Sequence, residues 1–261
     1  MSQKKVGIRA LRQDLPDMIR RVEATGEPLV VTRHGTALAT IVPAEGAGPQ
    51  KALPATPHII ALASLKGGVG KTTLAMHLAA AIAQEQERVV VLDADEEVSA
   101  LRWQQHAQAE RVALPFEVMA ADRNTLMRQA RRLAQEGCTV VIDTPPNNRE
   151  ILKSAATVAD VVLVPVLPTG LDVDRLATTL ELLTDLEAAL PSFNYAIVLN
   201  RFDARKGMAH EANQALNAHP RLETVVKSLS AYEKVFGRAP VELGQFREIW
   251  AEIRAALEDE Q

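Results

Sequence analysis

The stretch KGGVGKTT at residues 66–73 decides the fold of most of this chain. It follows a short apolar segment, residues 58–63 (HIIALA), and precedes an apolar segment of helical character, residues 74–84. A strand, a glycine-rich turn and a helix in this order form a phosphate-binding loop, because free N–H groups at the start of the helix point at an anion. The stretch therefore predicts a nucleotide site in an α/β domain.

Each position of this loop has an expected part in holding ATP and Mg²⁺. The backbone N–H groups surround the β-phosphate, the second lysine neutralises β- and γ-phosphate oxygens, and the next hydroxyl binds Mg²⁺. Thr72 is thus one expected metal ligand. The nucleotide-binding residues expected from the loop are Gly67, Gly68, Val69, Gly70, Lys71, Thr72 and Thr73.

The loop departs from the common G-x-x-x-x-G-K-[ST] pattern. Leu65 stands where that pattern has its first glycine, and Lys66 follows one position later. In this form the loop resembles that of the ParA/MinD-type ATPases. The resemblance implies that Lys66 acts across a dimer interface on the neighbouring subunit's phosphates, and that Lys66 and Lys71 are both catalytic. A solvated loop lysine is the alternative for Lys66.

Two acidic segments continue the resemblance. Residues 93–103 (DADEEVSALRW) end a strand-like run, and the family pattern implies that Asp95 positions the attacking water. Glu96-Glu97 stands where the family has Pro-Gln, which adds negative charge near a phosphate site. Residues 139–146 (TVVIDTPP) form a buried strand ending in Asp143, expected to hold an Mg²⁺-bound water beside the loop.

Asn200 closes a further strand-like segment, residues 193–199, in the sequence LNR. The resemblance implies that its side-chain amide recognises adenine; an asparagine that only ends the strand as a turn residue is the alternative. Apolar runs at 160–167 and helical segments at 171–190 and 246–258 complete the pattern. The predicted fold is α/β, with a P-loop, mostly parallel sheet and helices on both faces.

Composition is that of an ordinary globular protein, with 261 residues, 47% hydrophobic and 24% charged. No signal peptide and no apolar run of membrane-spanning length is visible, so a cytoplasmic protein is expected. The last helical segment ends in acidic residues 258–260, unlike the basic amphipathic anchors of MinD-like proteins. The single cysteine, Cys138, cannot form an internal disulfide.

A separate small unit precedes the P-loop domain. Residues 43–57 contain four prolines and two glycines without apolar periodicity, which is typical of a linker. We expect a small domain at residues 1–43, a linker at 44–57 and the ATPase domain at 58–261. Residues 1–45 carry a net charge of +2 and the remainder −6.

The small unit is predicted to contain strands near residues 6–8, 29–32 and 37–42, with a helix ending near Val22. Residues 26–43 (GEPLVVTRHGTALATIVP), with ALRQDL before them, resemble the Phd/YefM antitoxin DNA-binding domain, a small α+β domain. The resemblance implies a dimer that reads operator DNA; a plain dimerisation module is the alternative. The implied DNA contacts are Lys4, Lys5, Arg9 and Arg12.

Together the resemblances imply a compact ParA-type partition ATPase. ATP would close a homodimer that binds DNA non-specifically on the nucleoid, and a ParB-like centromere-binding protein would trigger hydrolysis. The small unit would repress its own operon. Basic residues of the ATPase domain form a candidate DNA surface, with scattered surface cations as the alternative. They are Arg205, Lys206, Lys227, Lys234 and Arg238.

Two other functions stay open, and one is excluded. The chain could position a protein cargo, or it could be a transcriptional regulator whose ATPase gates operator binding. A nitrogenase-like electron carrier shares the deviant loop but needs two cluster cysteines per subunit, and this chain has one cysteine.

Overall fold

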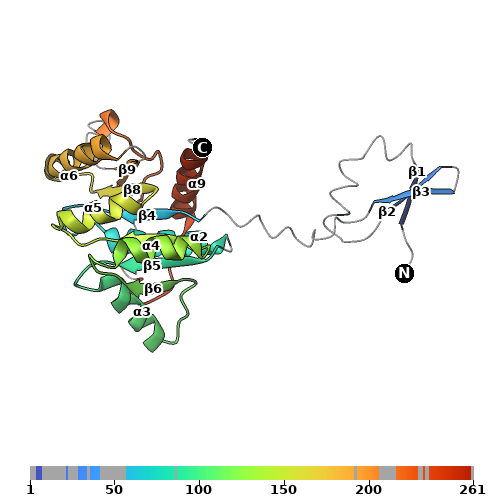
Figure 1. The fold of residues 1–261 in the computed structure, drawn as a ribbon, viewed down its shortest axis with the longest axis horizontal. Helices are drawn as coiled ribbons and strands as arrows, with labels where there is room; N and C mark the ends of the chain where they lie inside the picture. The colour runs from blue at the N-terminus through green and yellow to red at the C-terminus, as the bar shows by residue number, and fades with distance from the viewer. Residues whose placement is uncertain are drawn as a thin grey trace. The chain divides into compact units, whose positions relative to one another are not determined.

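The computed structural model describes residues 4–7, 22, 29–33, 36–41, 57–85, 87–190, 193–205, 216–228, 232 and 235–259. The chain divides into two compact units, Met1–Ala55 and Thr56–Gln261 (Figure 1). The domain boundaries expected near residues 43 and 57 stay predictions.

The small unit contains a three-stranded sheet in the order β1-β2-β3. Strand β1 pairs in parallel with β2, and β2 pairs antiparallel with β3 across a bulge at Val31/Thr32. The Thr32 hydroxyl donates to the Val6 carbonyl at 3.2 Å, which adds a side-chain link between β1 and β2. The predicted strands are therefore present, whereas the predicted helix lies outside the described residues apart from the buried Val22. The strands are β1 (Lys4–Gly7), β2 (Leu29–Arg33) and β3 (Thr36–Ile41).

The large unit is built on a six-stranded, wholly parallel sheet in the order β6-β5-β7-β4-β8-β9. The first strand, β4, lies between β7 and β8, so the chain builds one half of the sheet before it crosses to the other. Such a change of direction opens a crevice at the carboxyl ends of the strands. The strands are β4 (Ile59–Leu62), β5 (Val89–Asp93), β6 (Glu117–Ala120), β7 (Thr139–Asp143), β8 (Val161–Val166) and β9 (Tyr195–Leu199).

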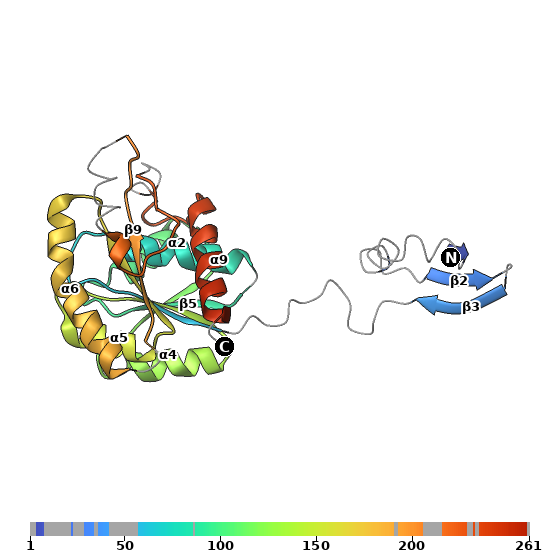
Figure 2. The same cartoon turned by 90° about the horizontal axis from the view of Figure 1, so that it is seen from above.

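Helices cover both faces of this sheet (Figure 2). Strand residues alternate between two apolar cores: Ile60 and Leu62 pack with α2, α3 and α9, whereas Ile59 and Ala61 pack with α4, α5 and α6. This arrangement confirms the predicted α/β fold. The helices are α2 (Lys71–Gln84), α3 (Ser99–Ala109), α4 (Leu126–Gln135), α5 (Arg149–Val158), α6 (Gly170–Ala189) and α9 (Gly244–Asp259), with a 3-10 turn η1 (Leu216–Ala218).

Some elements were not visible in the sequence. Helix α2 begins at Lys71, three residues before the apolar segment that indicated it, so the second half of the P-loop is helical. Strand β6 lies at the sheet edge, and Val118 is its one buried residue. In α4 the buried residues are Leu126, Ala130 and Leu133, and most of the residues between them are polar. The apolar patterns of β6 and α4 are therefore too short or too polar to predict these elements from the sequence. Within the described ranges, no helix has the length and apolar character needed to cross a bilayer.

His77 is a buried imidazole of helix α2. It is 1% exposed, and its Nδ1 donates to the Thr73 carbonyl at 2.7 Å. Its ring lies 4.8 Å from that of Phe246 and 5.0 Å from that of Tyr232. Burial lowers the pKa of His77 to about 4, with the Thr73 hydrogen bond opposing the shift. His77 is therefore a neutral member of an aromatic cluster at ordinary pH.

The shifted pKa of His77 predicts acid sensitivity of the large unit. Between pH 6.5 and about 4, His77 is protonated in the unfolded chain but neutral in the folded chain. The free energy of unfolding therefore falls as the pH falls, by roughly 3 kcal/mol for this group. His77→Phe keeps a ring in the cluster and should reduce that loss. Urea unfolding of both proteins at pH 7 and pH 4.5, followed by tryptophan fluorescence, measures the difference; equal losses would contradict it.

Candidate nucleotide-binding site

The P-loop joins the carboxyl end of β4 to the N-terminus of α2. Gly68 and Gly70 have φ values of 76° and 92°, which favour glycine, and a Cβ on Gly70 would lie 2.4 Å from Asn200 Nδ2. No side chain caps α2 at Gly70, while the Leu74 N–H donates to the Gly70 carbonyl at 2.9 Å. The first N–H groups of α2 are thus available to an anion in the crevice.

Lys71 is a buried cation at the start of α2. Its side chain is 6% exposed, and its Nζ donates to the Lys66 carbonyl at 3.3 Å across the turn. Burial lowers the pKa of Lys71, while the nearby charges of Asp143 and Asp95 oppose that shift. A phosphate placed at the turn would add negative charge beside this lysine and favour its charged form.

Asp143 ends β7 directly beside β4, where it pairs in register with Leu62. It is 1% exposed, and neither of its side-chain oxygens has a hydrogen-bond partner among the described residues. Burial raises the pKa of Asp143 to about 7; the charge of Asp93 adds to the shift, and the Thr72 hydroxyl and Lys71 oppose it. Buried acceptors without donors need a cation or an ordered water. Asp143 and Thr72 therefore fit a hydrated Mg²⁺.

Asp93 and Asp95 organise the loop after β5. Asp93 Oδ2 accepts the Leu101 N–H of α3 at 3.0 Å, and its Oδ1 accepts the Asp95 N–H at 3.2 Å. Burial raises the pKa of Asp93, and these two backbone donors oppose the shift. Asp95 Oδ1 accepts the Glu97 N–H at 2.9 Å, while the Glu97 side chain is exposed to solvent. The acidic pair at residues 96–97 thus forms a turn beside the site.

Val98 holds that loop in a strained conformation. Its φ of 50° and ψ of 41° place a β-branched residue in the left-handed region, at a cost of about 1–2 kcal/mol. The Val98 N–H donates to the Asp95 carbonyl at 2.9 Å, and its own carbonyl accepts the Arg102 N–H at 2.8 Å. Strain of this kind, maintained by neighbouring bonds, is common in switch segments.

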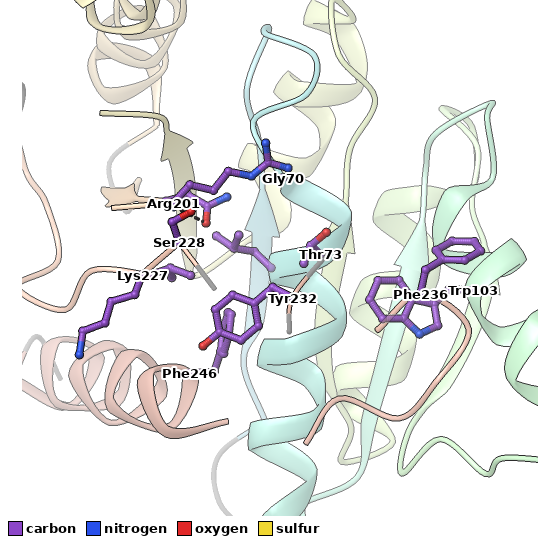
Figure 3. Close-up of a pocket in the computed structure, with 12 residues that line it drawn as sticks. Gly70, Thr73, Trp103, Arg201, Lys227, Ser228, Tyr232, Phe236 and Phe246 are labelled. Atoms are coloured by element: carbon purple, nitrogen blue, oxygen red, sulfur yellow. Dashed lines mark hydrogen bonds between the residues drawn. The ribbon is translucent and has the colours of Figure 1, made fainter. Parts of the chain in front are cut away.

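A cavity of about 280 Å³ adjoins the P-loop (Figure 3). Its wall comes from the start of α2, from residues 200–201 after β9, from residues 226–228, and from aromatic side chains. Four of the chain's nine aromatic residues line it, which suits an aromatic base, and Arg201 and Lys227 add positive charge. The aromatic residues are Trp103, Tyr232, Phe236 and Phe246.

Asn200 lies in the wall of this cavity but is already engaged by the protein. Its Nδ2 donates to the Val69 carbonyl of the P-loop at 2.7 Å, and its Oδ1 accepts the Arg201 N–H at 2.9 Å. Asn200 is 4% exposed. These contacts fasten β9 to the P-loop, and the second amide N–H remains for a ligand. The prediction that Asn200 recognises adenine stays a prediction.

The structure brings most of the predicted site residues into one place. The P-loop residues 66–73, Asp95, Asp143 and Asn200 all meet at the carboxyl edge of β4, β5, β7 and β9. Their individual roles stay predictions. The sequence did not predict that aromatic residues or Arg201 line the site. Because aromatic residues make up 3% of the chain, each one could have been considered as a candidate lining residue.

The predicted DNA-contact residues are only partly described. Arg205 is exposed and pairs with Asp203 at 2.9 Å, whereas Lys227 and Arg238 are exposed near the cavity. The backbone of Lys4 and Lys5 belongs to β1. Outside the described residues lie Arg9, Arg12, Lys206 and Lys234.

Comparison with known proteins gives two family matches. Residues 58–243 match the model of the VirC1 protein family, and residues 3–46 match that of the type II toxin–antitoxin antitoxin Phd_YefM. The relative "Maintenance of carboxysome distribution protein A" of Gloeobacter kilaueensis is 35% identical over 183 residues, which are 68% of this chain and 80% of that protein. The chromosome-partitioning ATPase Soj of Thermus thermophilus is 28% identical over 244 residues, covering 77% of this chain and 96% of Soj.

A solved structure has the same fold as the large unit. A substituted McdA of Cyanothece in complex with ATP superposes with a TM-score of 0.60 at 17% identity, covering 78% of this chain and 96% of that one. The parallel sheet with helices on both faces is thus shared with a protein of known nucleotide complex.

Removing the buried cation should strongly weaken nucleotide binding. In Lys71→Ala the phosphates lose a charge-assisted bond inside the crevice, so ATP affinity should fall roughly 100-fold, as about 3 kcal/mol implies. Arg88→Ala is the matched control, because Arg88 bonds the Glu136 carbonyl at the opposite end of β5. Titration calorimetry with ATP measures both; near-normal affinity in Lys71→Ala would contradict the site.

Proposed function

Because the chain belongs to the VirC1 family of ParA-type P-loop ATPases, we propose that it is a partition ATPase that segregates plasmid or mobile-element DNA. The observation that supports the nucleotide chemistry best is the meeting of the P-loop, the buried Lys71 and the buried carboxylate of Asp143. The antitoxin-type match of residues 3–46 favours DNA as the cargo, because we propose that this unit is a second nucleic-acid-binding unit.

Each residue of the nucleotide site has a separate role in this proposal. Backbone N–H groups of residues 67–71 and the Lys71 ammonium hold the phosphates, and the cavity beside them takes the nucleoside. Thr72 and Asp143 hold Mg²⁺, which when bound neutralises charge on the β- and γ-phosphate oxygens. Asp95 orients the attacking water at the mouth of the crevice.

Lys66 acts across the homodimer in this proposal. Its backbone N–H is fixed by the Ser64 hydroxyl at 3.2 Å, and its side chain is partly exposed at the rim of the loop. A cation at that rim is well placed for a phosphate bound by a second copy, which makes dimerisation depend on ATP.

Non-specific DNA binding is assigned to exposed cations of the large unit. Lys227 and Arg201 line the cavity (Figure 3), and Arg238 is an exposed residue whose carbonyl is bonded to the lining residue Trp103. Arg205 contributes less, because its guanidinium is bonded to both oxygens of Asp203 at 2.9 Å. Lys206 and Lys234 complete the proposed surface. A ParB-like partner would stimulate hydrolysis and release the DNA.

A protein cargo is the second candidate. The 35% identical relative is named for the distribution of carboxysomes, which supports positioning of a protein assembly as an alternative function. Deletion of the gene separates the two: loss of the replicon at cell division supports DNA segregation, while stable inheritance with a misplaced protein assembly supports the protein cargo.

DNA binding should require ATP and the cation at the rim of the loop. The full chain should bind DNA without an operator only with ATP, and Lys66→Ala should bind ATP but neither dimerise nor bind that DNA. Lys227→Ala with Arg238→Ala should lower the slope of log affinity against log salt by about two, one per phosphate contact.

The control for charge is Arg131→Ala, an exposed arginine of α4 on the other face of the sheet, which should leave the slope unchanged. Fluorescence anisotropy and analytical ultracentrifugation give the measurements. These measurements are repeated in the Arg9→Ala, Arg12→Ala background, which should disable the operator-reading unit; ATP-independent DNA binding by that variant would contradict the cycle.

The small unit should read an operator upstream of its own operon. Arg9→Ala with Arg12→Ala should erase a footprint there and leave ATP hydrolysis within about twofold, since the residues lie in the N-terminal unit. Arg20→Ala with Arg21→Ala removes the same charge elsewhere in that unit and should keep the footprint. A genome-wide binding map without a peak near the gene would show that the unit only dimerises.

A further inference from the structure

Helix α3 connects two parts of the nucleotide site that are far apart in the sequence. Its first turn is bonded to the loop after β5: the Leu101 N–H donates to Asp93 Oδ2 at 3.0 Å, and the Val98 N–H donates to the Asp95 carbonyl at 2.9 Å. The strained Val98 lies at the junction between Asp95 and the helix. A change in the position of Asp95 therefore acts directly on the start of α3.

The middle of α3 is bonded to residues 235–238. The indole N–H of Trp103 donates to the Arg238 carbonyl at 2.8 Å. The Phe236 ring lies 5.5 Å from that of Trp103 and 5.2 Å from that of His106. Gly237 has a φ of 74°, and a Cβ there would lie 2.7 Å from the His106 Cβ, so only glycine allows this approach.

The segment bonded to α3 also lines the nucleoside cavity. Phe236 and Tyr232 line this cavity together with Gly70 and Thr73 of the P-loop (Figure 3), and Phe236 remains 49% exposed. Trp103 is itself a lining residue and is 2% exposed. The two ends of a bound nucleotide would thus face two segments that are joined through one helix, at Asp95 and at Phe236.

We propose that α3 couples the Asp95 loop to the nucleoside cavity, with Trp103 as the positioning residue. A γ-phosphate that moves Asp95 changes the start of α3 at Val98 and, through the Trp103–Arg238 bond, the wall of the cavity. Because coupling between two sites is reciprocal, a base in the cavity stabilises in turn one arrangement of Asp95. This inference rests on the proposed function, namely on ATP in this site and on Asp95 facing the γ-phosphate.

The two tryptophans of the chain provide a matched pair of variants. Trp250 of α9 is also fully buried, but it does not line the cavity and lies beside Glu87 and Arg254, whereas the indole N–H of Trp103 donates to the Arg238 carbonyl next to the cavity. Tryptophan-to-phenylalanine changes at the two positions remove the same atoms, but only Trp103→Phe removes a hydrogen bond next to the site.

The first test separates turnover from binding. Trp103→Phe should lower kcat about tenfold, the factor that one lost hydrogen bond of about 1.4 kcal/mol represents, and leave the Kd for ADP within about threefold. Trp250→Phe should keep both values. A tenfold weaker binding of ADP by Trp103→Phe, or an unchanged kcat, would overturn the proposal, since the residue would then be part of the cavity wall alone.

The second test reads the position of α3 directly. In Trp250→Phe, the single tryptophan emission from Trp103 should differ between ADP and a non-hydrolysable ATP analogue, and the additional change Asp95→Ala should remove that difference while both nucleotides still bind. In the unsubstituted chain the same ATP-minus-ADP signal should vanish on Trp103→Phe, which tests the proposal even if Trp250→Phe does not fold.

The outcomes separate this inference from the proposed function. Identical Trp103 spectra with the two nucleotides, in a protein that binds and hydrolyses ATP, would overturn the coupling and leave the ATPase intact. Failure of the unsubstituted chain to bind ATP would overturn both.

Discussion

The buried charge of Lys71 at the carboxyl edge of the sheet is the constraint on which the large unit depends. A lysine removed from water is costly unless opposite charge is near, and here Asp143 and Asp95 supply it. Those carboxylates are close only because β4 lies between β7 and β8, with β5 one strand further. The order of the strands is therefore part of the electrostatics of the site. Among the described residues, neither oxygen of Asp143 has a hydrogen-bond partner, so a bound cation would complete the arrangement.

The same edge explains why the surrounding loops carry unusual backbone. Gly70 approaches Asn200 so closely that no side chain fits, and the Asn200 amide then holds the P-loop through the Val69 carbonyl. Val98 accepts a left-handed conformation that a β-branched residue disfavours. The strands hold one part of the site rigidly. The conformation of the loops that form the rest depends on a few specific hydrogen bonds.

The two units of the chain differ in how much apolar core they contain. The large unit has two apolar cores, one on each face of its sheet, and these are sufficient for independent stability. In the small unit the structure describes three short strands, with Leu29, Val30 and Val31 buried. A sheet of that size needs a further surface to cover it, which is consistent with the dimer proposed for it.

The sequence by itself determined the P-loop, the strand that precedes it and the acidic ends of two later strands, because these signals are local: glycine spacing, apolar runs and an aspartate directly after them. It therefore predicted the α/β fold and placed Lys71 and Asp143 in one expected site, to which the family resemblance added Asp95. It did not reveal α4 or β6, whose buried residues are few among polar ones.

Only the tertiary structure decided what surrounds those residues. Asn200 meets Val69 across 131 positions of the chain, and Trp103 meets Arg238 across 135. Contacts of that separation leave no periodic signal in the sequence, because each depends on how several helices pack around the sheet. The cavity beside the P-loop, its aromatic lining and the contacts of α3 all belong to this class.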